Sequence, residues 1–173
     1  PEIPFSLKEV EDQELMTGLE NDHFQLVFIR KNMVDPDLYT FHLLAEDRLV
    51  AVLPAGHPLS AKKSLNLTEL KRDSFILMPP HTSIYRLCMH SFHNAGIHPQ
   101  ILRTARAESI VSAVEIGEGI SLLAESSFHL FRQPSLVAVP INGLDKLSIG
   151  IACKKNMTLT SSAECFLRFV ESH

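Results

Sequence analysis

Residues 44–59 read LAEDRLVAVLPAGHPL, and this stretch decides the fold. Its middle, Leu49–Leu53, is a continuous apolar run that is closed by Pro54 and Gly56. A run this short, stopped by turn residues, predicts a strand that is buried on both faces. The charged residues just before it separate it from a second strand-like run, Leu38–Leu44. The sequence therefore predicts two strands joined by a short polar crossing, an arrangement that can link two lobes.

Upstream of this stretch, the pattern is that of a strand, a helix and a strand. Ile3–Val10 alternates in hydrophobicity well enough for a strand, and Asp12 is placed to cap the helix that follows. That helix is expected to end at Asn21, and Phe24–Ile29 is expected to form the next strand. A strand, a helix and a strand with short links indicate a parallel α/β unit.

Downstream of the stretch, a strand followed by a helix recurs three times. The predicted strands are Phe75–Met78, Gln100–Thr104, Ile120–Leu123 and Leu136–Ile141. The predicted helices are Leu65–Lys71, Ser83–Ala95, Glu108–Ile116 and Ser126–Phe131. A strand over Lys146–Cys153 and a helix over Ser161–Val170 close the chain. We therefore expect an α/β fold, and open α/β lobes bind ligands outside the carboxyl ends of their strands.

The bulk composition is that of an ordinary globular protein. The 173 residues are 45% apolar and 21% charged, which fits one large domain or two small lobes. The net charge of -4 argues against electrostatic binding of a nucleic-acid backbone by this chain. The three cysteines are far apart and lie in apolar segments, so we expect buried thiols in a reducing cytoplasm. No apolar run reaches the length of a membrane span, and no membrane partner is expected.

Chemistry that makes or breaks covalent bonds finds no support in the sequence. There is no Gly-x-Ser-x-Gly elbow, and no Ser or Cys has a His and an orienting acid at a recognisable spacing. His90 and His93 lie one helical turn apart and could bind a metal with a third ligand, but a solvent-facing pair is the favoured interpretation. Gly117 and Gly119 end a helix rather than open one, so they form no phosphate loop. We expect no enzyme activity, no metal and no cofactor.

Polar groups at the ends of predicted strands are the remaining candidates for a site. His81, Thr82 and Ser83 follow a strand and open a helix. Backbone N–H groups and hydroxyls at a helix start favour an anion. The alternative is that Thr82 or Ser83 only caps the helix, and both interpretations can hold together.

Two further groups stand at corresponding places in the chain. The next predicted helix opens with Ala107, Glu108 and Ser109. Glu108 also complements the helix dipole, which is its purely structural explanation. Arg30 follows the strand Phe24–Ile29, where it either offsets charge in a site or is a solvated surface residue.

The stretch that decides the fold also carries a resemblance to a known family. The matching residues are Glu46, Leu49, Val52, Pro54, His57, Pro58 and Leu59. They resemble the crossing between the two lobes of the effector-binding domain of LysR-type transcriptional regulators. The likeness continues through Gly117–Ser121 to the last strand and helix, so it covers about the whole chain.

The resemblance implies two Rossmann-like lobes of the periplasmic-binding-protein type II plan, joined by two crossing strands. The first lobe would comprise residues 1–44 and 142–173, and the second lobe residues 45–141. In the family, a strand and a helix precede the first segment seen here, so the first lobe is expected to be incomplete. The family's effector site lies in the cleft between the lobes, where Asp12 and Ala107–Ser109 would face it. Asp12 stands where the family often has a small hydroxyl residue.

The implied function is that of a ligand-sensing domain, which binds an anionic metabolite and thereby modulates DNA binding and transcription. The likeness is somewhat greater to the subgroup that controls the breakdown of aromatic compounds. Promoter DNA would be bound only through an N-terminal helix-turn-helix domain outside this chain. The full protein would be a homodimer or homotetramer and would contact RNA polymerase. A periplasmic-type solute-binding protein is the alternative, but the His57-Pro58-Leu59 crossing and the short length favour the regulator.

Overall fold

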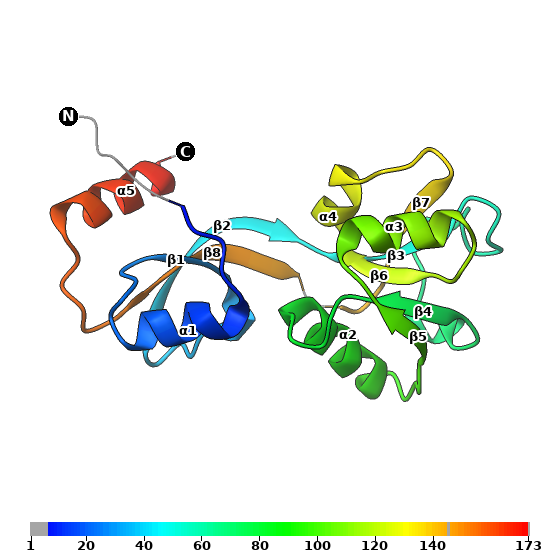
Figure 1. Ribbon diagram of the computed structural model, residues 1–173, viewed down its shortest axis with the longest axis horizontal. Coiled ribbons are helices and arrows are strands. Elements are labelled where there is room, and N and C mark those ends of the chain that lie inside the picture. The colour runs from blue at the N-terminus through cyan, green and yellow to red at the C-terminus, as the bar shows by residue number, and fades with distance from the viewer. Residues whose placement is uncertain (1–6, 145, 173) are drawn as a thin grey trace. The chain divides into compact units, whose positions relative to one another are not determined.

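The computed structural model describes residues 7–144 and 146–172. The chain divides into two compact units (Figure 1). Unit 1 comprises Pro1–Glu46 and Ser148–His173, and unit 2 comprises Asp47–Leu147. Within residues 7–144 and 146–172, no helix combines the length and the apolar character that crossing a membrane would require.

Unit 2 is built around β3 (Leu49–Pro54), the apolar run of the opening stretch. β6 (Ser121–Ala124) and β7 (Leu136–Pro140) flank β3, and both run antiparallel to it. All five residues of Leu49–Leu53 are buried, so the prediction of a strand covered on both faces is confirmed. The antiparallel direction of both neighbours was not predicted, because an apolar run indicates burial but not the direction of the partner strand.

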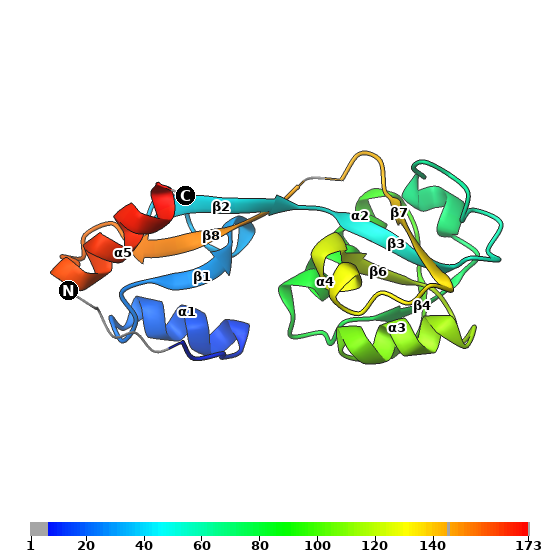
Figure 2. The ribbon, with the colours of Figure 1, turned by 90° about the horizontal axis from the view of Figure 1, so that it is seen from above.

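The alternation of side chains along β3 divides the core of unit 2 into two layers. Leu49, Ala51 and Leu53 pack with Cys88 and Phe92 of α2 (Ser83–Asn94). The residues between them, Val50 and Val52, pack against α3 (Ala107–Glu115) and α4 (Glu125–Leu130). Figures 1 and 2 show α2 on one side of these strands and α3 on the other.

A parallel pair extends unit 2 beyond this antiparallel sheet. β4 (Ser74–Leu77) and β5 (Gln100–Thr104) are parallel, with Leu77 paired to Thr104 at their carboxyl ends. The Ile76 N–H donates to the Ile120 carbonyl at 2.9 Å, which links β4 to the start of β6. The short helix η2 (Leu67–Leu70) precedes β4. The predicted βα rhythm is therefore confirmed for β4, α2, β5 and α3.

Unit 1 holds a three-stranded sheet in the order β1 (Val27–Arg30), β8 (Leu147–Lys154) and β2 (Tyr39–Asp47). The helix α1 (Asp12–Glu20) covers one face of that sheet. Its Leu19 packs on Val27 and Ile29 in a small core. The last helix, α5 (Ser161–Glu171), is held by a 2.6 Å contact between His42 Nδ1 and Glu171 Oε1. A short 3-10 helix, η1 (Lys31–Met33), follows β1.

Two expectations about unit 1 differ from the structure. In the strand predicted over Ile3–Val10, residues 7–10 have no strand conformation, and residues 3–6 lie outside the described residues. The parallel unit expected of that strand with Phe24–Ile29 has no strand partner in residues 7–10, and β1 pairs instead with β8, to which it is antiparallel. The pattern gives no information on a partner strand that arrives from more than a hundred residues away, and the register pairs Val27 with Ala152.

Candidate functional site

The start of α2 is fixed by Thr82. Its Oγ1 accepts a hydrogen bond from the Tyr85 N–H at 3.2 Å, and its hydroxyl donates to the Pro79 carbonyl at 2.7 Å. Thr82 is therefore the N-cap of α2, as one of the two interpretations predicted. The next residue, Ser83, is only 3% exposed, so its side chain is buried at the start of α2 rather than lying on the surface.

A positive charge stands beside this helix start. Arg86 lies on the first turn of α2, and its Nη1 donates to the His81 carbonyl at 2.9 Å. His81 itself is exposed. The N-terminal end of a helix carries a partial positive charge, and the guanidinium group adds a full one. The combination favours a negatively charged group near His81–Ser83. Arg86 was not among the predicted residues, although its place four residues after Thr82 puts it on the first turn of α2.

The start of α3 lies at the same edge of unit 2. β4 and β5 are parallel neighbours, and the Ala105 N–H donates to the Leu77 carbonyl at 2.9 Å just beyond their ends. The N-cap of α3 is Arg106, whose side chain makes no capping hydrogen bond. Ala107 is half-buried, and both Glu108 and Ser109 are exposed. Unit 2 therefore brings the two predicted groups, His81–Ser83 and Ala107–Ser109, to the carboxyl edge of one parallel pair.

The other two predicted residues belong to unit 1. Asp12 is the first residue of α1, and Glu11 rather than Asp12 is the N-cap. This corrects the expectation that Asp12 caps the helix, because the backbone of Asp12 is already helical. Arg30 is the last residue of β1 and is half-buried. α1 and β1 run in opposite directions, so α1 begins at the end of unit 1 where β1 finishes (Figure 2).

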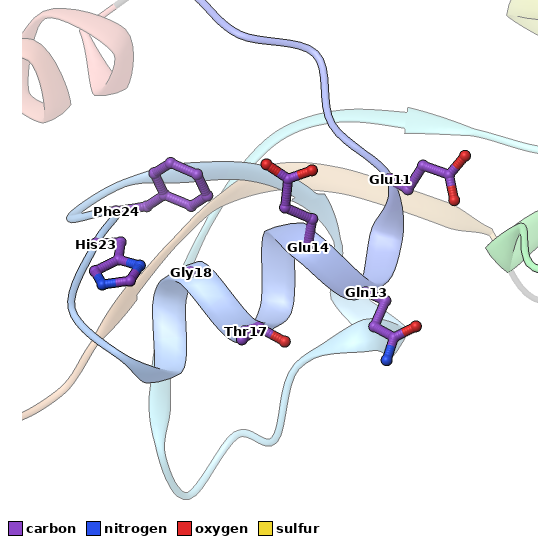
Figure 3. Close-up of a pocket in the computed structure, with 7 residues that line it drawn as sticks. All are labelled: Glu11, Gln13, Glu14, Thr17, Gly18, His23 and Phe24. Atoms are coloured by element: carbon purple, nitrogen blue, oxygen red, sulfur yellow. The ribbon is translucent and has the colours of Figure 1, made fainter.

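A depression of about 460 Å³ lies on α1 and the loop that follows it (Figure 3). Its lining residues are Glu11, Gln13, Glu14, Thr17, Gly18, His23 and Phe24. The Phe24 ring packs so closely on Gly18 that a Cβ atom at this position would collide with it. Lys8 Nζ is bonded to Glu14 at 2.8 Å. This depression includes none of the predicted site residues, and its carboxylates disfavour an anion.

Two reactive side chains of α2, Cys88 and His90, lie outside this arrangement. Burial raises the pKa of the Cys88 thiol to about 12, so Cys88 is not a nucleophile at neutral pH. His90 Nε2 lies 3.0 Å from Asn94 Nδ2, one turn further along α2. Across the described part of the chain, no three His, Cys, Asp or Glu side chains are grouped in a way that could hold a metal ion. Unit 2 thus places two helix starts and the guanidinium group of Arg86 at one edge, where they favour a negatively charged group.

Comparisons with known proteins agree on one family. A family model described as "LysR substrate binding domain" matches residues 1–173. The chain is 27% identical over 172 residues to the transcriptional dual regulator GltC of Bacillus subtilis (strain 168). That match covers 98% of this chain and 57% of GltC, so the chain spans little more than half of this relative.

Two solved structures show the same fold. The regulatory domain of CcmR from Synechocystis PCC6803, in complex with 2-PG, has a TM-score of 0.83 at 20% identity, covering 96% of this chain and 81% of that one. The effector binding domain of BenM with its effector benzoate has a TM-score of 0.80 at 24% identity, covering 95% of this chain and 76% of that one. The fold class predicted from the sequence, the type II periplasmic-binding-protein plan, is confirmed by these likenesses.

Proposed function

The chain belongs to the family of LysR substrate-binding domains, and on that premise we propose that it senses a small anionic molecule for a transcriptional regulator. Binding of that molecule would modulate DNA binding by a helix-turn-helix domain that is not part of these 173 residues. We also propose that the regulator works as a homodimer or homotetramer that contacts RNA polymerase. The chain itself would bind its ligand without chemical turnover.

One observation carries this proposal. Two helices of unit 2 begin at the carboxyl edge of the parallel pair β4 and β5. Helix starts offer N–H groups and a positive field to an anion, and Arg86 adds a cation beside the first of them. Open α/β sheets bind ligands at the carboxyl ends of their strands. We propose His81, Thr82, Ser83, Ala107, Glu108 and Ser109 as ligand-contacting residues of unit 2, and Asp12 and Arg30 as candidate residues of unit 1.

The proposed ligand class is an organic acid, with aromatic acids first. BenM binds benzoate, a carboxylate on an aromatic ring, and the two chains have the same fold. A carboxylate matches the charge of the two helix starts and of Arg86. Exposed Glu108 would disfavour ligands that carry additional negative charge close to α3. The site is therefore expected to prefer a single carboxylate held near α2.

The ligand can change the regulator only through a difference in affinity between two states of the domain. A shift from a rare state to a dominant one requires a difference of about 5 kcal/mol between the two binding free energies. The start of α2 is fixed by the Thr82 cap before the ligand arrives, so it supplies affinity, and the difference between the two states must come from contacts that only one state offers.

The Thr82→Val variant is expected to bind an aromatic carboxylate about 2- to 10-fold more weakly. The hydroxyl of Thr82 is already bonded to Pro79 and Tyr85, so its removal loosens the helix start that presents the N–H groups. A lost neutral hydrogen bond of about 1 kcal/mol corresponds to that change. Calorimetric titration with benzoate, or with a related acid that raises the melting temperature, gives the affinity.

Thr82→Ser is the matched control, because it keeps the hydroxyl that caps α2. Its affinity is expected to stay within about twofold of the unmodified chain. Circular dichroism would establish that both variants are folded. Equal affinities of Thr82→Val and Thr82→Ser would remove the start of α2 from the proposed site.

A further inference from the structure

Asp47 and Arg48, which connect β2 to β3, are hydrogen-bonded to the first turn of α4. Asp47 Oδ2 accepts from the Ser126 hydroxyl at 2.6 Å, and both of its carboxylate oxygens lie 3.4 Å from the Ser126 N–H. Ala124, the N-cap of α4, has no side chain that could cap the helix. Asp47 therefore supplies the cap from a distant part of the sequence.

The next residue, Arg48, is bound to the same turn of α4 through an ion pair with Glu125. Arg48 Nε and Nη2 donate to the two carboxylate oxygens of Glu125 at 2.9 and 2.7 Å. The Glu125 N–H also donates to the Arg48 carbonyl at 2.9 Å. The hydrogen bond from Arg48 lowers the pKa of the Glu125 carboxyl, so the pair stays charged at neutral pH. A bidentate pair of this kind fixes the orientation of the two side chains as well as the distance between them.

The residues before Asp47 form the exposed end of β2. Leu43, Leu44, Ala45 and Glu46 are all exposed, and Leu43 is 56% exposed despite its apolar side chain. On the second passage of the chain, Leu147 is 4% exposed and belongs to the core of unit 2. Both segments that connect the two units are therefore held by contacts within unit 2 where they enter it. Exposed segments with few apolar contacts are where local motion concentrates.

We propose that Asp47 and Arg48 form a clamp that makes the crossing, β3 and α4 move as one body, so that the chain bends within Leu43–Glu46. A change in the position of Asp47 or Arg48 would then displace β2. It would not be taken up by movement between these two residues and α4. This clamp would act in the same way whichever molecule the chain binds.

Distance measurements by pulsed electron paramagnetic resonance test the clamp. Cys165 in unit 1 is exposed and accepts a spin label, whereas Cys88 and Cys153 are buried. A second label at Lys71→Cys marks unit 2, because Lys71 is exposed. Arg48→Ala in this background is expected to broaden the distribution of label-to-label distances, since it adds a second bending point. An unchanged distribution would overturn the proposal.

Arg103→Ala is the matched control. It breaks an equally two-pronged pair, in which Arg103 Nε and Nη2 contact Glu118 at 2.6 and 2.8 Å, elsewhere in unit 2. Its distance distribution should equal that of the parent, and broadening as large as that of Arg48→Ala would refute a special role for the crossing. Glu125→Ala, which removes the clamp from the other side, should reproduce Arg48→Ala. In both clamp variants the α4 amides should exchange hydrogen about fivefold faster.

Discussion

Replacing Phe75 with alanine is expected to lower the free energy of unfolding of unit 2 by about 3–5 kcal/mol. Phe75 is 0% exposed, and its ring meets that of Phe92 edge to face, with centroids 4.8 Å apart. Its loss would leave a cavity between β4 and α2 that the surrounding sheet cannot close. Because whole domains of this size are stable by only about 5–15 kcal/mol, the variant should be close to unfolding at 37 °C.

Urea unfolding followed by circular dichroism measures this effect. Phe169→Ala is the control, because Phe169 is 59% exposed on α5 in unit 1. Its free energy of unfolding is expected to change by about 0.5 kcal/mol or less. Similar midpoints for Phe75→Ala and Phe169→Ala would show that the core of unit 2 is not the one described.

Gly150→Ala is expected to destabilise unit 1 by about 1–3 kcal/mol or more, while unit 2 stays folded. A Cβ atom at Gly150 would collide with the His42 carbonyl oxygen and with the Phe41 ring, because β8 lies between β1 and β2. The backbone oxygen cannot move aside as a flexible side chain would. β8 is also the strand that joins both neighbours in this sheet, so a shift there disturbs the whole of unit 1.

Thermal unfolding should therefore separate into two transitions in Gly150→Ala, of which only the lower one belongs to unit 1. Gly56→Ala provides the control, since nothing lies within 4 Å of a Cβ added at Gly56. That change is expected to be neutral or slightly stabilising, because it restricts the unfolded chain. A single transition at the original temperature in Gly150→Ala would contradict the close packing of β8 on β2.

The elements that could be predicted from the sequence are those with a strong local pattern. The run Leu49–Leu53 and the stops at Pro54 and Gly96 indicate a buried strand and a helix end, and the structure has both. The directions of β6 and β7 could not be predicted, because they depend on contacts between residues far apart in the chain. The same holds for the pair Arg48–Glu125, whose members are separated by 77 residues.

The candidate site divides in the same way. Thr82 could be found because threonine at a helix start is a local signal, and its capping role is confirmed. The capping role expected of Asp12 was wrong by one position, because an acidic residue is equally common in the first turn, and the N-cap is Glu11. The contact of Arg86 with the His81 carbonyl required the structure, since a side-chain direction is not encoded in spacing alone.

The two units and the helix starts of unit 2 explain why a sensing role suits this chain. The anion-favouring groups are backbone N–H groups at helix starts and a guanidinium group, which bind without offering a nucleophile. Cys88 is buried, with a raised thiol pKa, and takes no part. These groups support the proposed binding of a small anion.

The most direct test of this account is a thermal-shift titration of the 173-residue chain with benzoate, other aromatic acids and their ring-opened products. At least one acid is expected to raise the melting temperature in a saturable way. At a concentration of a hundred times its dissociation constant, that acid should raise the free energy of unfolding by about 3 kcal/mol. Chromatography after overnight incubation should recover that acid unchanged. Conversion of the acid into a product, or no stabilisation by any acid of the series, would contradict the account.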